Sequence, residues 1–177
     1  MKSKDIAIVG ILLAIGAILR YFLAMLHTPL TPNMIIAFYC LAIILIRPKV
    51  LEALGIGLVA GLLSMVISSS MFPPANLISE PIGAFVCFAL YAVLSERTKV
   101  APTVTTFVTT LASGFSFAAV ALFFVGGTVL ASPKYGGDIM AFVAVFVPIV
   151  VITAVFNAII VQLLYIPSSR VLLRGQE

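Results

Sequence analysis

Residues 6–26 read IAIVGILLAIGAILRYFLAML, a segment in which Arg20 is the single charged residue. A helix that crosses a bilayer needs about 20 mostly apolar residues, so this segment is long enough to span the membrane. A signal peptide has a shorter apolar core and a small-residue cleavage site after it, and the segment fits neither feature. The sequence therefore begins with a predicted transmembrane helix.

The composition of the whole chain agrees with this start. Hydrophobic residues make up 63% of the 177 residues, charged residues make up 9%, and the mean hydropathy is +1.28. Such a chain has too little polar surface to cover a soluble globule, which indicates an integral membrane protein. At about 20 residues a crossing, six helices with short loops leave no room for a soluble catalytic or ATP-binding domain.

Proline, glycine and charged residues divide the chain into six apolar segments. We predict an all-α, integral membrane bundle of six transmembrane helices that forms a single domain over residues 1–177. The second and fourth segments are short for a full crossing, and the fifth is longer than a crossing needs, which indicates tilt or extension beyond the lipid. The expected spans are 5–26, 32–47, 50–70, 81–95, 102–131 and 139–165.

The basic residues predict the orientation, because Lys and Arg near helix ends are retained on the cytoplasmic side. Both termini are therefore expected in the cytoplasm, and the loops HTPLTP, MFPPANLISE and ASPKYGGD are expected outside. The net charge of +4 follows from this asymmetry and does not indicate a nucleic-acid partner. Eight of the ten basic residues fall on the cytoplasmic face: Lys2, Lys4, Arg47, Lys49, Arg97, Lys99, Arg170 and Arg174.

The stretch MFPPANLISEPIGAF, residues 71–85, combines three prolines with Asn76, Ser79 and Glu80. In the simpler interpretation the prolines end one helix, and Ser79 or Glu80 caps the next, with Pro81 in its first turn. The same polar groups also lie where an external solute would arrive, and ligand-binding loops use the residue types that caps use. The two interpretations are compatible, and both stay open.

Arg20 is the most informative single residue, since a charge inside a span costs about 3 kcal/mol even on the lenient insertion scale. It can snorkel to the outer interface, or its planar guanidinium can bind a ligand carboxylate. We favour the second interpretation because other polar residues converge on the outer end. Asn76, Glu80 and Asp138 are the candidate partners for a ligand ammonium.

The last span carries Asn157, an amide that can bond across helices or contact a ligand. Phe85 and Tyr135 are among the aromatic residues that can form a pocket wall. His27 is the single histidine, and no metal-ligating residue stands at suitable spacing from it, so no metal site is expected.

No enzyme motif is present in the sequence. The segment SGFSF around Ser116 lacks the glycine pattern of a nucleophile elbow, no HExxH occurs, and the acidic residues are dispersed. A Walker A sequence is also absent, so we do not expect an enzyme. Uphill transport by this chain would need an ion gradient or another subunit.

The first helix has a stripe of small residues. Gly10 and Ala14 form a small-xxx-small pair, with Ala7 and Ala17 one turn away, and such a stripe permits close helix contact. The contact can be made within the bundle or with another subunit.

Four segments carry a resemblance to a known family: AIGAILR (14–20), TPNMIIAFYCLAIILIRPKV (31–50), LGIGLVAGLLSMVISS (54–69) and ANLISEPIGAFVCF (75–88). Over about residues 4–90 the chain resembles the substrate-binding S component of an energy-coupling-factor transporter, and it is most similar to the bacterial tryptophan-uptake family. It departs from the family pattern at four positions. Asn33 replaces an acidic residue, Arg20 a histidine, and Ser79 and Glu80 an Asp followed by a Lys.

The resemblance implies a multi-pass subunit of the bacterial cell membrane that captures tryptophan, or a related small molecule, from outside. Such a subunit topples within the bilayer when joined to a transmembrane coupling protein and two cytoplasmic ATPases, and it has no cofactor of its own. The stripe at Ala7, Gly10, Ala14 and Ala17 would then contact the coupling protein. The expected substrate-binding residues are Arg20, Asn33, Asn76, Ser79, Glu80, Phe85, Tyr135 and Asn157.

Three alternatives remain: an S component for a vitamin, a stand-alone ion-coupled carrier, and a structural protein that binds no ligand. A proton-coupled carrier needs an ionisable group deep in the membrane that alternates its protonation. Within the expected spans that group would have to be Arg20, which stays charged.

Overall fold

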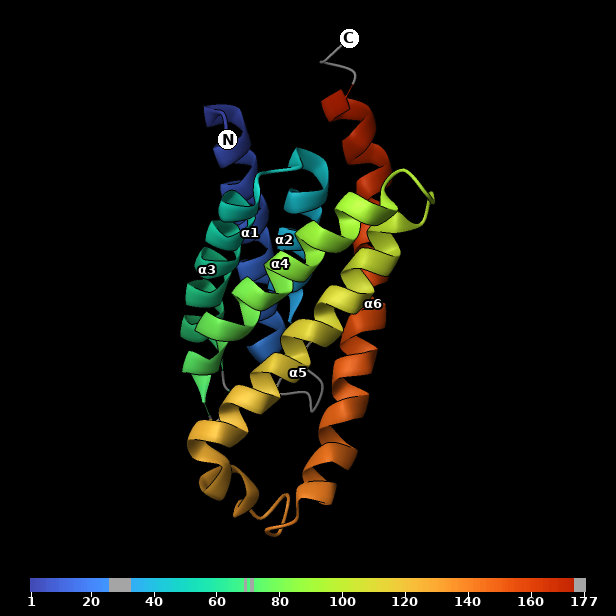
Figure 1. Cartoon of the computed structure of the whole chain (residues 1–177). Helices are drawn as coiled ribbons and strands as arrows, with labels where there is room; N and C mark the ends of the chain where they lie inside the picture. The colour runs from blue at the N-terminus through green and yellow to red at the C-terminus, as the bar shows by residue number, and fades with distance from the viewer. Residues whose placement is uncertain (26–32, 69, 71, 174–177) are drawn as a thin grey trace.

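The computed structural model describes residues 1–25, 33–68, 70 and 72–173. The chain forms an all-helical bundle in which α1 begins and α6 ends at the same end, opposite the α5–α6 loop (Figure 1). The predicted all-α bundle is confirmed, whereas the side of the membrane on which the termini lie stays a prediction. The expected loop 27–32, which contains His27, and Arg174 lie outside the described residues. The elements are α1 (Ser3–Met25), α2 (Met34–Ile46), α3 (Val50–Ile67), the 3-10 turn η1 (Pro73–Ala75), α4 (Asn76–Leu94), α5 (Ala101–Leu130) and α6 (Ile139–Leu173).

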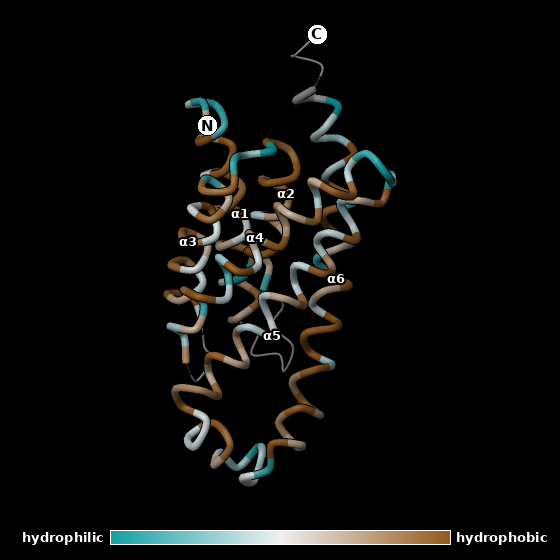
Figure 2. The backbone as a smooth tube through the Cα atoms, in the orientation of Figure 1, coloured by the Kyte–Doolittle hydropathy of each residue, from teal (hydrophilic) through white to brown (hydrophobic). Residues whose placement is uncertain are grey.

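Within the described residues five helices, α1, α3, α4, α5 and α6, are long and apolar enough to cross a membrane. Hydrophilic residues gather at the two ends of the bundle, and apolar residues predominate along the helices between them, with some hydrophilic residues in the middle of the bundle (Figure 2). This distribution is the one that a bilayer imposes on a helical bundle, because polar side chains are costly within the hydrocarbon core.

The short helix α2 lies in the middle of the protein. It has 13 residues and is about 20 Å long, less than the hydrocarbon thickness of about 30 Å. Its side chains from Met34 to Ile44 are all buried, and it packs against α1, α3, α4, α5 and α6. A helix that is apolar all round is stable when neighbouring helices enclose it. Because protein encloses it, this helix does not need the length of a membrane-spanning segment.

Two glycines on α3 set its distance from α4. A Cβ atom on Gly57 would lie 2.7 Å from the Cβ of Ala84 and 2.9 Å from the main-chain oxygen of Glu80. A Cβ atom on Gly61 would lie 2.7 Å from the main-chain oxygen of Asn76. Gly57 and Gly61 form a GxxxG pair, which allows two helix backbones to approach closely. Sequence analysis recognised such a pattern in the first helix and missed this one.

Residues 72–85 are mostly helical, which corrects the expectation of an external loop. Pro73 opens the turn η1, and the Asn76 side chain closes it by donating from Nδ2 to the Pro73 carbonyl at 2.7 Å. Helix α4 starts at Asn76, so Ser79 and Glu80 lie within it and do not cap it, and Pro81 is inside the helix and not in its first turn. The turn at Pro73 lets the helix begin earlier than the prolines suggested.

The last two helices are longer than a crossing requires. Helix α5 agrees with its predicted bounds within a residue and is interrupted at Val125, which has φ −134° and ψ 24°. Helix α6 continues to Leu173, beyond the expected end at 165, with Pro148 and Pro167 inside it. The α5–α6 hairpin therefore extends past the other helices at the end opposite the N-terminus (Figure 1).

Candidate binding site

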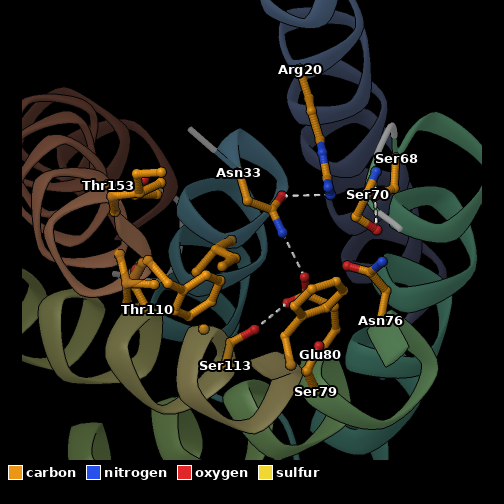
Figure 3. Close-up of a pocket in the computed structure, with 16 residues that line it drawn as sticks. Arg20, Asn33, Ser68, Ser70, Asn76, Ser79, Glu80, Thr110, Ser113 and Thr153 are labelled. Carbon is orange, nitrogen blue, oxygen red and sulfur yellow. Dashed lines mark hydrogen bonds between the residues drawn. The ribbon is translucent and has the colours of Figure 1, made fainter. Parts of the chain in front are cut away.

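A cavity of about 170 Å³, here called the inner cavity, lies among five of the helices. Its walls combine hydroxyl, amide and charged side chains with the apolar side chains of Ile36, Phe117, Phe146, Ile149 and Val150. The polar side chains around it are Arg20, Asn33, Ser68, Ser70, Asn76, Ser79, Glu80, Thr110, Ser113 and Thr153 (Figure 3).

A larger cavity of about 540 Å³, here called the outer cavity, adjoins the inner one. Arg20, Phe117 and Phe146 line both cavities, and the outer cavity extends to Lys134 and Tyr135 on the α5–α6 loop. Its volume lies in the range of about 300–1,000 Å³ that is typical of small-molecule sites. The two cavities together connect the α5–α6 end of the bundle with the polar residues in its interior.

Four side chains from four segments, here called the polar chain, form consecutive hydrogen bonds beside the inner cavity (Figure 3). Arg20 Nη1 on α1 donates to Asn33 Oδ1 at 2.9 Å, and Asn33 Nδ2 donates to Glu80 Oε1 on α4 at 2.6 Å. Ser113 Oγ on α5 donates to Glu80 Oε2 at 3.0 Å. Asn33 immediately precedes α2, so the position of this buried helix places the Asn33 amide between Arg20 and Glu80.

The chemistry of arginine determines the direction of these bonds. A guanidinium can only donate, so the oxygen of the Asn33 amide faces Arg20 and its NH₂ group faces Glu80. Both carboxyl oxygens of Glu80 accept a hydrogen bond, as an ionised carboxylate does, although the residue is only 1% exposed. A buried charge is tolerated when such bonds replace those of water. Among the described residues, no ion pair joins Arg20 directly to Glu80.

Asn157 on α6 forms hydrogen bonds with the main chain of one member of the polar chain and with a neighbouring hydroxyl group. Its Nδ2 donates to the main-chain oxygen of Asn33 at 3.2 Å and to Thr110 Oγ1 at 3.3 Å. The side chain is fully buried, and its Oδ1 has no partner in the part of the chain that the structure describes. Asn157 lines neither cavity. Asn157 was expected either to bond across helices or to contact a ligand, and in the structure it bonds across helices.

The structure brings most of the expected site residues together. Arg20, Asn33, Asn76, Ser79 and Glu80 line the inner cavity. Arg20 reaches into this cavity and bonds to Asn33, whereas snorkelling would direct it to the membrane surface. Asn76, Ser79 and Glu80 are at most 2% exposed, so they belong to the interior and not to an external loop.

Other expected residues lie elsewhere. Tyr135 lines the outer cavity, whereas Phe85 is 48% exposed and lines neither cavity. Asp138, a candidate partner for an ammonium group, also lines neither cavity, and it accepts the backbone N–H of Met140 at 2.9 Å. The carboxylate of Asp138 therefore caps the start of α6.

The small-residue stripe of α1 divides in the structure. Ala7, Gly10 and Ala14 are exposed on the outside of the bundle, and a Cβ atom on Gly10 would meet no atom within 4 Å. Ala17 is buried in the main core cluster, so its side chain packs within the bundle. The stripe thus presents three of its four residues to the surroundings.

Sequence analysis missed the contribution of α5. A sequence signal was present, because hydroxyl residues recur at helical spacing and should share one face. All of them are buried, and two line the inner cavity. They are Thr105, Thr106, Thr109, Thr110 and Ser113, of which Thr110 and Ser113 reach the cavity. Phe117 and Phe146 had no comparable signal among the 13 phenylalanines of the chain.

The polar chain joins residues that are distant in sequence. Arg20, Asn33 and Glu80 are consecutive members of it, although 13 and 47 residues separate them along the chain. A change at one of these positions therefore alters the hydrogen-bond partner of the next.

Comparison with known proteins identifies the family. The family model described as "Tryptophan transporter TrpP" matches residues 2–173. A relative from Bacillus subtilis (strain 168), named "Probable tryptophan transport protein", is 32% identical over 178 residues, which cover 98% of this chain and 95% of that protein. No solved structure matches the chain. Together with the five membrane-length apolar helices, these matches indicate a multi-pass protein of the cell membrane. The chain belongs to the tryptophan transporter TrpP family.

Proposed function

We propose that this chain binds tryptophan in the inner cavity and the adjoining part of the outer cavity, and that it delivers tryptophan into the cell as the S component of an ATP-driven energy-coupling-factor transporter. The names of the family and of the Bacillus subtilis relative support tryptophan as the substrate. The observation that carries the proposal is the presence of one cation and one carboxylate in a single cavity beside two phenylalanines. A zwitterionic aromatic amino acid needs these groups.

Each part of tryptophan has a partner in this arrangement. The carboxylate binds the guanidinium of Arg20, whose planar fork suits a carboxylate. The ammonium binds Glu80, since a carboxylate has about four acceptor positions and the described hydrogen bonds occupy two of them. The indole ring lies against Phe117 and Phe146, which line both cavities. Tyr135 belongs to the path through the outer cavity.

Calorimetric titration of the purified protein with tryptophan tests this site. A hydrogen bond to a charged group is worth about 1.5–3 kcal/mol, so Arg20→Ala and Glu80→Gln should each weaken binding about tenfold to a hundredfold. Phe85→Ala is the matched control, because Phe85 is exposed and lines neither cavity, and it should keep the affinity of the unaltered protein. Normal affinity in both charge variants would remove these residues from the site.

A thermal-stability screen against amino acids and vitamins tests the identity of the substrate. A ligand that binds only the native state raises the melting temperature by mass action. Tryptophan should give the largest increase. If the unaltered protein is stabilised by a vitamin and does not bind tryptophan, the substrate assignment is wrong.

The proposal of ATP-driven uptake depends on partner subunits. The chain has no nucleotide-binding motif, and α1 exposes the small residues Ala7, Gly10 and Ala14, a surface on which another helix can pack closely. We place the transmembrane coupling protein there, with the two ATPase subunits bound to it in the cytoplasm. Ala17 is buried and takes no part in this surface.

Replacement of Ala14 tests the coupling surface. Ala14→Trp should abolish tryptophan uptake by cells, because a bulky ring prevents close helix contact, and it should leave the affinity of the purified protein unchanged. Phe123→Trp, at a position that is 83% exposed on α5, is the control and should keep uptake. Normal uptake by the Ala14→Trp protein would place the coupling protein elsewhere.

A proton-coupled carrier is the second candidate, and the burial of Glu80 favours it. Glu80 was expected in an external loop, but it lies inside α4 and is 1% exposed. A carboxyl group in this position can alternate its protonation, which Arg20 cannot. Proteoliposomes that contain this chain alone separate the two mechanisms. Tryptophan accumulation driven by a proton gradient would establish the carrier and contradict dependence on ATPase partners.

A further inference from the structure

We infer that Asn33 determines the charge selectivity of the inner cavity, because its neutral amide separates Arg20 from Glu80 and leaves both charges for the ligand. The inference rests on the proposed function, since it concerns how the proposed site distinguishes tryptophan from related indoles. It assigns to Asn33 a role as a spacer between the two charged residues, in addition to that of a lining residue.

Asn33 forms a hydrogen bond with each of the two charged residues. The amide accepts from Arg20 at 2.9 Å on one side and donates to Glu80 at 2.6 Å on the other. It therefore satisfies part of the hydrogen-bonding capacity of each charged group, and it carries no net charge of its own. A direct ion pair would have paired the two charges with each other, and a ligand would have to break that pair before binding.

The spacer is held in one orientation. If the amide were reversed, its NH₂ group would face the donors of Arg20 and its oxygen would face the acceptors of Glu80, and both contacts would be repulsive. The main chain is held as well, because Asn157 Nδ2 donates to the Asn33 carbonyl at 3.2 Å. Asn33 thus keeps a fixed position between the charges.

The charged residues that line the inner cavity determine which ligands it can bind. Among the described residues that line the inner cavity, Arg20 is the cation and Glu80 is the anion, and the other polar side chains are neutral amides and hydroxyls. A zwitterion supplies one opposite charge to each. Tryptamine lacks the carboxylate and leaves Arg20 unpaired, whereas indole-3-propionate lacks the amine and leaves Glu80 unpaired. An unpaired charge is costly when water is excluded, so the cavity should reject both compounds.

Calorimetric titration with these three compounds is the first test. The unaltered protein should bind tryptophan at least about tenfold more tightly than tryptamine or indole-3-propionate. If it binds tryptamine or indole-3-propionate as tightly as tryptophan, the inference is wrong, whatever any variant does. If it does not bind tryptophan at all, the proposed function fails first.

The variant Asn33→Asp is the second test, because it changes the charge of the spacer and hardly its size. The introduced carboxylate would pair with Arg20 and add a negative charge beside Glu80. The affinity for tryptophan should fall about tenfold or more, and the ratio of tryptamine affinity to tryptophan affinity should rise by at least the same factor. Retention of the original ratio would overturn the inference while leaving tryptophan binding by the unaltered protein intact.

Asn76→Asp is the matched control. Asn76 is a buried amide that lines the same cavity and bonds to the Pro73 carbonyl, so it does not lie between the two charges. Its replacement adds the same charge to the same cavity. The ratio should change less than in Asn33→Asp, and an equal change would show that the total charge of the cavity decides selectivity and that the spacer does not. Melting curves of both variants verify that they are folded.

Discussion

At the scale of single residues, Arg20 and Gly57 differ in how far the sequence reveals their roles. A charge in an apolar segment is conspicuous, and the charge of Arg20 led to the prediction that its side chain faces polar partners. The role of Gly57 depends on its closeness to Pro81, Ala84 and the Glu80 carbonyl. These three residues are distant from Gly57 in the sequence, so the sequence around Gly57 does not reveal the contact. Close approach at Gly57 places the first turns of α4, and therefore Glu80, against α3.

Gly57→Ala should lower both the stability and the tryptophan affinity of the protein. The added methyl group would lie within 3 Å of backbone atoms of α4, so the two helices must separate, and overpacking of this kind costs about 1–3 kcal/mol. We expect a melting temperature that is lower by several degrees and a weaker calorimetric affinity. Gly55→Ala is the control, since its methyl group would meet no atom within 4 Å. Equal behaviour of the two variants would contradict the role of Gly57 in positioning α4.

At the scale of helices, α2 shows how the bundle builds its site. The helix is too short to cross the bilayer, and its enclosure by the other helices places its first residues in the interior. Asn157 on α6 bonds to the carbonyl of Asn33 just before this helix. A second amide on α6, Gln162, accepts from Thr103 at 2.6 Å, about two helical turns along α5 from Thr110. The first bond supports the polar chain, and the second only joins two helices.

Asn157→Leu and Gln162→Leu should therefore have different effects. Each removes a bond between α6 and a neighbouring helix, so both should lower the melting temperature of the purified protein. Asn157→Leu should also weaken tryptophan binding, by about tenfold, because it releases the main chain of Asn33, which immediately precedes α2. Gln162→Leu should keep the original affinity. Calorimetry on the two variants checks this difference, and unchanged affinity in Asn157→Leu would show that α2 is positioned without this amide.

At the scale of the whole molecule, the distribution of charge predicts its orientation. The turn between α4 and α5 carries Arg97 and Lys99, and the opposite α5–α6 loop carries Lys134. Since basic residues are retained in the cytoplasm, the α5–α6 loop and the mouth of the outer cavity should face outward. This predicted orientation would direct the cavities toward the side from which the substrate comes under the proposed function.

Labelling of single introduced cysteines tests the orientation. Cys40 and Cys87 are fully buried, so the unaltered protein should react little and can serve as the background. On intact cells a membrane-impermeant maleimide should label Pro133→Cys in the α5–α6 loop but not Glu96→Cys in the α4–α5 turn. Both should react after lysis. The reverse pattern on intact cells would place both termini outside.

The sequence by itself determined the class of the protein, its all-helical architecture and five of the ten polar side chains that line the inner cavity. The physical reason is that a bilayer acts on each segment separately. Every span must be apolar, long enough and satisfied in its own backbone hydrogen bonds, and these requirements are visible locally in segments such as 6–26. A charged residue within such a segment, such as Arg20, is therefore conspicuous without any knowledge of its neighbours, whereas the hydroxyl residues of α5 were not.

Only the tertiary structure decided which of these residues act together. Arg20, Asn33 and Glu80 come from three segments, and Asn157 joins them from a fourth, so their hydrogen bonds depend on how the helices pack. Packing also placed Glu80 at a buried position of α4 and not in a loop, and it left Phe85 on the same helix exposed. Local composition cannot determine these outcomes, because each arises from contacts between residues that are distant in sequence, such as those that the glycines of α3 allow.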